Sequence, residues 1–375
     1  DFATGTGTNI GLAPYNNNKT NSWEYLTASA TGAFEIGKGY AVKLTTPAEI
    51  SFTGTINTLD VTVEINNGIS TNFNLLGNPY PSYINSATFA GDNTTEFSEE
   101  TVWLWDGTVY KAYNSLNSVE IAPGQGFFID SASPFGTGIV TFHTENQSHQ
   151  NSDTFLKQTP NKKVTLFVES DNVKKETAIY YVADKTIGFD NGYDSRIFGG
   201  VTADFEIFSA LVSDNEAYQL AIQALPETAL ENTIVPIGLI AEAGKELTFS
   251  VETENLPDDI LVYLEDKVNT TFVNLSEKEY KITLTEAVNG IGQFYIHTSS
   301  KTLTTADNSK SLNNVRIYKS SKNEISIVGL QAKAKVTVYS TLGREILTSH
   351  VNTNEITTLK LPVSSGVYVV RLDSP

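Results

Sequence analysis

The strongest constraint on the fold is a series of short alternating segments separated by turn-forming residues. The segments 61–65 (VTVEI), 165–170 (TLFVES), 260–266 (ILVYLED) and 336–340 (VTVYS) mix β-branched and aromatic residues with polar ones, and Gly, Asn, Asp and Pro lie between such segments. This composition and a period of two are typical of strands. Helical segments do not intervene regularly, so the sequence predicts an all-β chain of tandem antiparallel β-sandwich domains, immunoglobulin-like or jelly-roll-like.

The best candidate for a helix is NEAYQLAIQAL at 215–225. Its apolar residues fit a stripe at helical spacing, and the alternation Tyr218, Leu220, Ile222, Ala224 fits a strand equally well. Periodicity alone does not choose between the two. We predict a strand here, in keeping with the rest of the chain.

The chain of 375 residues has the length of two or three domains. Two polar stretches are predicted to be linkers: 144–153, which lacks large apolar residues, and 299–314. The predicted domains are therefore 1–150, 151–300 and 301–375, of which the last is a small immunoglobulin-like β-sandwich.

A weak internal repeat lies in the first predicted domain. The segments 34–44 (FEIGKGYAVKL) and 121–131 (IAPGQGFFIDS) share Gly-x-Gly, an aromatic residue and an apolar strand, and strands with a central Phe52 or Phe142 follow. Gly-x-Gly lets the backbone bend sharply before a buried strand. Because few residues precede the first copy, we expect 1–150 to hold an N-terminally truncated repeat.

Composition excludes several classes of protein. The net charge of −18 argues against binding to nucleic acid, and no apolar run is long enough for a transmembrane helix. The lack of cysteine excludes disulfides, thiolate metal sites and cysteine nucleophiles. Since the chain has no methionine and starts at Asp1, we expect a processed piece from which any signal peptide has been removed.

The sharpest candidate for a binding site is the predicted hairpin TVWLWDGTVYKAY at 101–113. Asp106-Gly107 is typical of a two-residue type I′ turn, which would place Trp105 opposite Thr108 and Trp103 opposite Tyr110. Trp103, Trp105 and Tyr110 would then share one face. Such rings stack on the apolar faces of sugars, which makes them candidate glycan-binding residues. The interpretation that we favour at this stage is that they belong to the core.

No catalytic residues are predicted. The four histidines (143, 149, 297 and 350) lie far apart, and no metalloprotease, phosphate-loop or serine-hydrolase motif occurs. The sequence does not exclude a Ser-His-Asp triad, because the three residues of a triad come together only in the folded structure. A pair of carboxylates for a glycosidase could come from Glu99, Glu100 and Asp106. We favour the interpretation that Glu99 and Glu100 are charged loop residues and that Asp106 is a turn residue.

A calcium site is the one cofactor that the sequence leaves open. Asp184, Asp190, Asn191 and Asp194 lie close together in a loop with glycine, as oxygen ligands of Ca²⁺ do. Their spacing differs from that of an EF-hand, and such residues are ordinary turn formers. The prediction is therefore no cofactor and no metal, with calcium as the alternative.

Most of the chain is similar to one group of proteins. The first two predicted domains resemble non-catalytic modules near the C-termini of large secreted proteins of Bacteroidetes, through the segments 73–85, 102–114, 121–130, 189–200, 218–226, 234–244 and 261–267. The last domain resembles the type A C-terminal sorting domain of type IX secretion. The matching segments there are VRIYKS (315–320), EISIVG (324–329), VTVYSTLGREI (336–346) and SSGVYVVRL (364–372).

The resemblance implies an export label, which a shuttle protein and the outer-membrane type IX translocon recognise and which is then cleaved or used for surface anchoring. The implied motif residues are Val338, Tyr339, Gly343, Arg344, Gly366, Tyr368 and Arg371. Members of this family usually continue with another turn and a Lys-bearing strand, whereas this sequence stops at Pro375. We therefore expect either a trimmed end or a shorter signal.

Three function classes follow. The first is a non-catalytic C-terminal region of a secreted or cell-surface protein, with the last domain as its export and anchoring signal. The second, compatible with it, is a carbohydrate-binding or adhesion module, with polysaccharide as partner. The third is an enzyme whose catalytic part lies upstream. We predict the first, outside the outer membrane, and no enzymatic activity in this chain.

Overall fold

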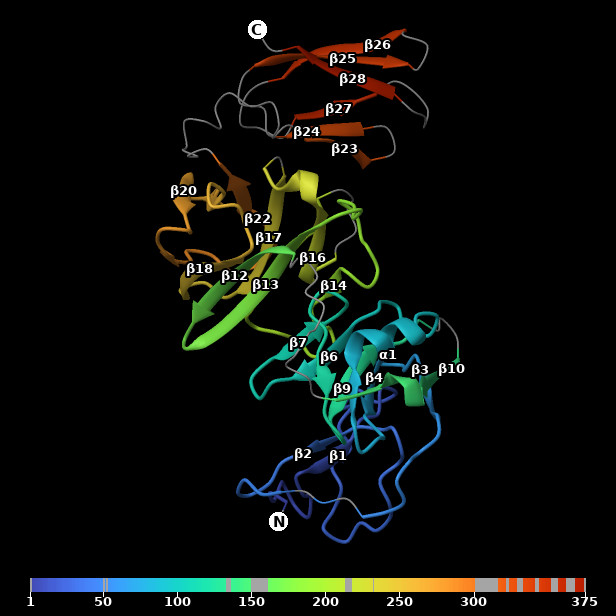
Figure 1. The fold of residues 1–375 in the computed structure, drawn as a ribbon. Coiled ribbons are helices and arrows are strands. Elements are labelled where there is room, and N and C mark those ends of the chain that lie inside the picture. The colour runs from blue at the N-terminus through green and yellow to red at the C-terminus, as the bar shows by residue number, and fades with distance from the viewer. Residues whose placement is uncertain are drawn as a thin grey trace. The chain divides into compact units, whose positions relative to one another are not determined.

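The computed structural model of the protein consists mainly of strands (Figure 1). It describes residues 2–49, 51, 53–132, 136–149, 161–212, 218–231, 233–300, 316–321, 324–328, 333–340, 344–351, 357–361 and 368–373. The one α-helix among these residues, α1 (Ser86–Asp92), is short and is capped at its start by the Asn85 side chain, which accepts from Ala87 N and Thr88 N. The predicted all-β class with antiparallel sheets is therefore confirmed.

The chain divides into two compact units. The first contains Asp1–Asn269 and Val273–Lys301, and the second contains Thr270–Phe272 and Thr302–Pro375. We call residues 2–149 the N-terminal segment and 161–300 the middle segment; apart from 270–272, both belong to the first unit. Residues 316–373, in the second unit, are the C-terminal segment. The division into three domains stays a prediction.

The N-terminal segment is built around the four-stranded antiparallel sheet β4-β9-β6-β7. Alternate residues of its strands face opposite sides, and both sides are apolar. Leu76, Leu104 and Phe127 pack into the segment's own core, whereas Trp103 and Phe128 belong to a second cluster on the other face. Burial on both faces explains why VWLW and GFFID are almost continuously apolar. The strand bounds are β1 Leu12–Pro14, β2 Tyr40–Val42, β3 Val61–Asn66, β4 Phe73–Gly77, β5 Tyr83–Asn85, β6 Val102–Trp105, β7 Tyr110–Tyr113, β8 Glu120–Ile121, β9 Gly126–Asp130, β10 Thr137–Phe142 and β11 Gln147–Ser148.

The register predicted for the β6–β7 hairpin is wrong. Trp105 pairs with Tyr110, and Trp103 pairs with Ala112, so the loop has four residues instead of two. The cause is the Asp106 carboxylate, whose Oδ1 accepts hydrogen bonds from the amides of Thr108 (2.8 Å) and Val109 (2.9 Å). An Asx-type turn therefore replaces the type I′ turn. Asp106 is a turn residue, as predicted.

The stretch after β10 is not a linker along its whole length, which corrects the prediction for 144–153. Residues 144–146 form a short 3-10 turn, and β11 pairs with β5. Asn146 is buried and donates to Asp92 Oδ2 at 2.6 Å. Polar side chains in this stretch form hydrogen bonds to backbone groups and to carboxylates. Composition alone does not distinguish such residues from polar residues that face solvent. Residues 150–153 lie outside the described residues.

The two Gly-x-Gly segments of the predicted repeat have matching structures. Gly37 and Gly124 have positive φ angles of 74° and 68°. The following glycines flank the same strand: Gly39 N donates to Leu75 O, and Gly126 pairs with Gly77 of β4. A bend is therefore present in both copies, but only the second precedes a buried strand: β9 is buried, whereas β2 is half-buried and its Val42 is exposed. Phe52 lies outside the described residues.

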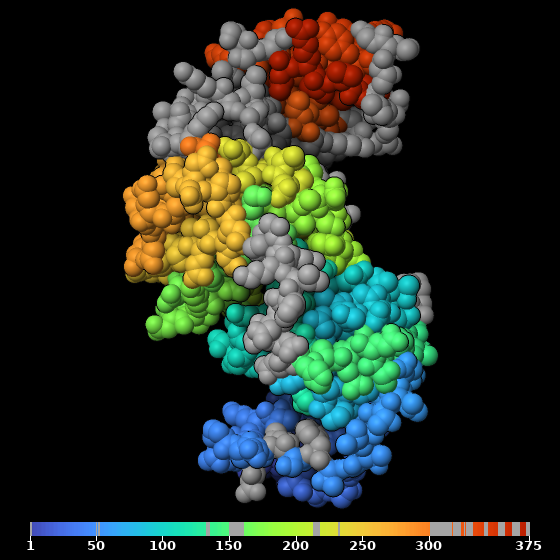
Figure 2. Space-filling view, viewed as in Figure 1, coloured from blue at the N-terminus to red at the C-terminus, as the bar shows by residue number. Residues whose placement is uncertain are grey.

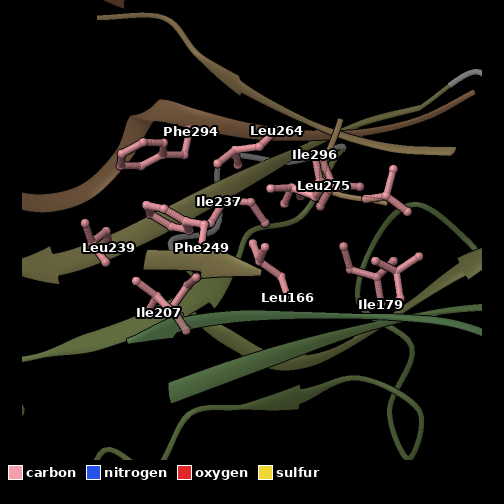
Figure 3. Packing of buried hydrophobic residues seen from close by; sticks show 14 of the residues in the cluster. Leu166, Ile179, Ile207, Ile237, Leu239, Phe249, Leu264, Leu275, Phe294 and Ile296 are labelled. Atoms are coloured by element: carbon pink, nitrogen blue, oxygen red, sulfur yellow. The ribbon is translucent and has the colours of Figure 1, made fainter. Parts of the chain in front are cut away.

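The middle segment forms one large sheet that curls around a single core. Its strand order is β20-β19-β22-β17-β15-β16-β13-β12-β18-β21, with β14 beside β16. Side chains from strands far apart in this order point into the same core, including Leu166, Ile237 and Phe294 (Figure 3). All pairings described are antiparallel except that of β13 with β16. The strand bounds are β12 Lys162–Ser170, β13 Val173–Val182, β14 Ser195–Arg196, β15 Glu206–Ser209, β16 Leu220–Pro226, β17 Ile234–Ala241, β18 Glu246–Glu254, β19 Leu261–Asp266, β20 Thr271–Asn274, β21 Tyr280–Thr283 and β22 Val288–Ser299.

The ambiguous segment 215–225 contains a strand. β16 starts at Leu220 and lies between β13 and β15, so both of its edges are paired. The strand prediction is confirmed from Leu220 onward, and residues 213–217 lie outside the described residues. Tertiary pairing decides here what periodicity leaves open.

The C-terminal segment consists of two three-stranded antiparallel sheets, β23-β24-β27 and β26-β25-β28. Their shared core contains Ile327, Val336, Val338 and Leu359. The strands are β23 Arg316–Ser321, β24 Glu324–Val328, β25 Ala334–Ser340, β26 Glu345–Val351, β27 Thr357–Lys360 and β28 Tyr368–Asp373.

The close approach of Gly39 to β4 gives a first prediction. A Cβ on Gly39 would lie 2.6 Å from Leu76 O, whereas one on Gly126 would lie 3.6 Å from the same atom. We expect Gly39→Ala to lower the free energy of unfolding by about 1–3 kcal/mol, because backbone would have to move. Gly126→Ala is the matched control and should be nearly neutral. Urea denaturation of both variants tests this, and equal stabilities would contradict it.

Candidate functional site

The candidate site is a groove of about 670 Å³ between the N-terminal and middle segments of the first unit. Its floor is the second face of the β4-β9-β6-β7 sheet, and the loop 197–206 of the middle segment lines its other side. The two segments lie next to each other in the space-filling view, the N-terminal segment in blue to green and the middle segment in yellow-green to orange (Figure 2). Aromatic residues from both line the groove: Trp23, Tyr40, Trp103, Trp105, Tyr110, Phe128 and Phe198.

The three aromatic residues predicted from sequence all lie on this face. Trp103 and Trp105 are two residues apart on β6, and Tyr110 faces Trp105 across the hairpin, with ring centroids 4.9 Å apart. Their environments differ, however. Trp103 is fully buried, whereas Trp105 is 50% exposed. The core interpretation therefore holds for Trp103 and fails for Trp105.

Phe198, which sequence analysis did not single out, closes the cluster from the middle segment. Its ring centroid lies 4.2 Å from that of Tyr110, 4.8 Å from Phe128 and 4.7 Å from Phe73. Such contacts between aromatic rings add to the free energy of burial. The sequence offered only a turn-like stretch with three aromatic residues, GFDNGYDSRIFGG, and such a stretch does not reveal a partner about 90 residues away.

Ion pairs supply polar groups at the groove wall. Lys175 Nζ lies 2.7 Å from Glu206 Oε2, and both side chains are largely buried. Lys111, just outside the groove lining, lies 3.6 Å from the lining residue Glu176 and 3.7 Å from Asp106. These groups offer hydrogen-bond donors and acceptors beside the exposed rings. Apolar surface with a few convergent polar groups is typical of small-molecule sites.

A buried charge cluster holds the two segments together next to the groove. Arg196 Nε donates to Glu99 Oε1 at 2.6 Å, and Arg196 Nη2 donates to Asp130 Oδ2 at 2.8 Å. Glu99 is fully buried, so its interpretation as a loop charge is wrong. Burial raises the pKa of Glu99, and Arg196 opposes that rise. The backbone carbonyl of Arg196 also accepts from Trp103 Nε1 at 3.0 Å.

Asp194 extends this cluster toward the middle segment. Its Oδ1 accepts from Ala224 N at 2.7 Å and its Oδ2 accepts from Asp190 N at 2.5 Å. Burial raises the pKa of Asp194 to about 7. The neighbouring Ser195 Oγ lies 2.8 Å from Thr101 Oγ1. The arrangement is a network of hydrogen bonds that positions the residues leading into Phe198.

The residues proposed as calcium ligands are mostly engaged in this loop structure. Asp190 Oδ2 accepts from Thr186 N, and Asn191 Oδ1 accepts from Glu100 N at 2.8 Å. Asp184 has a positive φ of 61°. Within the part of the chain that the structure describes, no group of three or more His, Cys, Asp or Glu is arranged to hold a metal. Calcium binding stays a prediction.

The other candidates for catalysis have separate partners. His143 bonds to Asp60 at 2.9 Å, and His297 bonds to Glu265 at 2.8 Å. His149 and His350 are exposed. Glu100 accepts from Thr94 Oγ1 at 2.6 Å, away from the turn held by Asp106. The structure gives these residues individual structural contacts.

The described residues of the implied sorting motif lie on β25 and β28, except Arg344, which directly precedes β26. Val338 is buried and pairs with Val370, Tyr339 pairs with Val369, and Ser340 pairs with Tyr368. Arg344 N donates to Ser340 Oγ at 3.2 Å, and the Arg371 side chain is exposed. Gly343 and Gly366 lie outside the described residues. None of the helices in the described part of the chain has the length and apolar content to span a bilayer.

Fold and groove define an all-β protein whose first unit carries an aromatic groove. The chain belongs to the family named DUF8693, a domain of unknown function, whose profile matches residues 6–119 and 108–297. No curated protein and no solved structure matches it.

The raised pKa of Asp194 gives the second prediction. In the unfolded chain the pKa of an aspartate is about 3.9, so the folded state binds the proton more tightly. Protonation of Asp194 therefore stabilises the folded state at low pH, and this contribution is lost as the pH rises through the folded pKa. Between about pH 5 and pH 8, the free energy of unfolding of the wild type should fall by roughly 2 kcal/mol relative to that of Asp194→Asn.

Denaturation with urea at a series of pH values measures this difference. Asp171→Asn, at a surface ion pair with a 70% exposed carboxylate, is the control and should keep the wild-type profile. Parallel profiles of the wild type and Asp194→Asn would contradict the assignment.

Proposed function

We propose that this chain is a non-catalytic region of an exported, cell-surface protein, in which the groove of the first unit binds a carbohydrate and the last domain acts as the export label. The observation that carries the binding role is the half-exposed Trp105 ring, held against Tyr110 at the groove wall.

A carbohydrate is the ligand class that best fits the groove. The faces of Trp and Tyr rings pack against the C–H faces of sugars, and their N–H and O–H groups add polar contacts. The nearby pairs Lys175–Glu206 and Lys111–Glu176 are fixed donors and acceptors for hydroxyl groups. A large hydrophobic side chain that stays half exposed beside such groups is more consistent with a binding surface than with the core.

A binding role also fits the carboxylates better than catalysis does. Glycosidases need one carboxylate that gives up a proton and a second that attacks or activates water. Glu99 is instead paired with Arg196, and Asp106 is committed to the β6–β7 turn. Their hydrogen bonds give both residues a structural role.

Replacing Trp105 tests the binding role. We expect Trp105→Ala to reduce the fraction of the full chain that is pulled down by insoluble cellulose, xylan, mannan or chitin. The free energy of unfolding should change by less than about 1 kcal/mol, because the side chain is half exposed.

The matched control is Tyr25→Ala, since Tyr25 is also an exposed aromatic residue (52%) but does not line the groove. Binding should survive in this variant. Failure of the wild type to bind any of the four polysaccharides, or equal binding by Trp105→Ala, would refute the role of the groove.

The role of export label is supported by the resemblance of residues 315–372 to a type IX sorting domain. These residues form most of the second compact unit, which has a core of its own. A small domain without disulfide or metal is only marginally stable alone, which suits a label that an export apparatus handles and removes. The shuttle protein and the outer-membrane translocon are its proposed partners.

Deleting residues 302–375 tests this role in a host with type IX secretion. We expect the shortened protein to accumulate in the periplasm, because the translocon would have no label to bind. Immunoblots of periplasm, cell surface and medium measure the distribution, and a translocon-deficient strain carrying the full chain is the control. Surface export of the shortened protein would exclude the proposed role.

A further inference from the structure

The aromatic face of the groove is built from two copies of one structural unit. In the first copy, β1 continues into a hairpin in which Tyr15 pairs with Trp23, and β2 returns beside β1. In the second copy, β6 continues into a hairpin in which Trp105 pairs with Tyr110, and β9 returns beside β6. The order of hairpin and return strand is the same in both.

The two hairpins carry aromatic pairs at the same position. Tyr15 and Trp23 have ring centroids 5.1 Å apart, and Trp105 and Tyr110 have centroids 4.9 Å apart. Tyr15 directly follows β1 and forms a bridge with Trp23, whereas Trp105 is the last residue of β6 and pairs with Tyr110, the first residue of β7. One residue of each pair is a tryptophan that lines the groove.

Both copies flank the same central strand, so their aromatic residues form one row. Lys38 forms a bridge with Leu76 of β4 on one side, and β9 pairs with β4 on the other. The Phe128 ring lies between the pairs, with its centroid 6.2 Å from that of Trp23 and 5.5 Å from that of Tyr110. The row therefore runs from Trp23 through Phe128 and Tyr110 to Trp105.

We propose that the groove holds a linear, uncharged polysaccharide across two subsites, one at Trp105 and Tyr110 and the other at Trp23 and Tyr40. This inference rests on the proposed carbohydrate binding and adds to it the length and the charge of the ligand. A ligand of repeating units suits a surface to which each copy contributes a tryptophan, Trp23 from the first and Trp105 from the second, with Tyr40 and Tyr110 also in the lining. A chain that reaches both subsites binds more tightly than one that fills either alone, because the second contact is intramolecular.

The charges of the groove favour an uncharged ligand. Among the described residues that line it, the charged ones are Lys175, Glu176, Asp204 and Glu206. Lys175 is paired with Glu206, and Lys111, just outside the lining, lies 3.6 Å from Glu176, so the negative charge that remains in the lining is that of Asp204. The net charge of the whole chain is −18. An anionic polymer such as a polyuronate would be repelled, since like charges without a counterion are unfavourable.

Calorimetric titration of the full chain with oligosaccharides of two lengths tests the proposal. The probes are the disaccharides and hexasaccharides of β-1,4-linked glucose, xylose and mannose, with hexagalacturonate as the charged comparison. We expect one of the neutral hexasaccharides to bind about ten-fold or more tightly than its disaccharide. Trp23→Ala and Trp105→Ala should each bring the affinity for that hexasaccharide close to that for the disaccharide.

Two variants separate binding from folding. Trp23→Tyr keeps a ring at this subsite and should keep most of the preference for the hexasaccharide, whereas Tyr25→Ala, outside the groove lining, should change nothing. Equal affinities for the disaccharide and the hexasaccharide would overturn the two-subsite proposal and leave carbohydrate binding intact. The same holds if Trp105→Ala loses binding while Trp23→Ala binds like the wild type. Tighter binding of hexagalacturonate would overturn the uncharged class. Absence of binding by every probe would refute both the proposal and the carbohydrate role.

Discussion

The architecture of the first unit depends on the contact of Arg196 with Glu99 and Asp130. These carboxylates belong to the N-terminal segment and the guanidinium belongs to the middle segment, so the ion cluster joins the two. Taking Glu99 out of water is unfavourable, and the geometry of the Arg196 guanidinium compensates for it by charge and by directed hydrogen bonds. Losing one partner of such a cluster typically costs about 3–5 kcal/mol, because a buried charge is left alone. The contact therefore specifies one arrangement of the segments more than it adds net stability.

The groove follows from this contact. Arg196 lies two residues before Phe198, and its carbonyl oxygen accepts from Trp103 Nε1. The junction thereby buries Trp103 under Phe198 and leaves Trp105, on the same face and two residues further, beside open space. A binding surface that lies where two rigid parts meet has its walls positioned by both. The proposed carbohydrate role thus depends on residues that would not themselves touch the ligand.

The sequence predicted the strands well and the long-range contacts poorly. Alternating segments predicted β3, β12 and β25 as strands; in β3 one face is buried, as the alternation implies, whereas β12 and β25 each contain a run of buried residues from both faces. The β6–β7 register was wrong because the Asp106 side chain bonds to Thr108 and Val109, which makes a longer turn than Asp-Gly alone implies. The interpretation of Glu99 failed for a different reason: its partner, Arg196, is 97 residues further along the chain. Local pattern carries no information on such a pair, whereas aromatic residues on one strand, such as Trp103 and Trp105, reveal their shared face directly.

The two copies of the hairpin unit differ at the position that meets the middle segment. Tyr15 corresponds to Trp105 in the pairing, so Ala13 corresponds to Trp103, and both are fully buried. Only the second copy has a side chain that reaches the Arg196 carbonyl and Phe198. The aromatic pair at the hairpin, in contrast, is present in both copies. Divergence at a position that serves assembly, together with a groove-lining tryptophan in each hairpin, is the pattern that a duplicated binding surface would show. Duplication alone does not explain why the residue at the junction differs between the copies while the aromatic pair at the hairpin is kept. The kept pair therefore argues that the two copies share the groove face as well as the strand pairing.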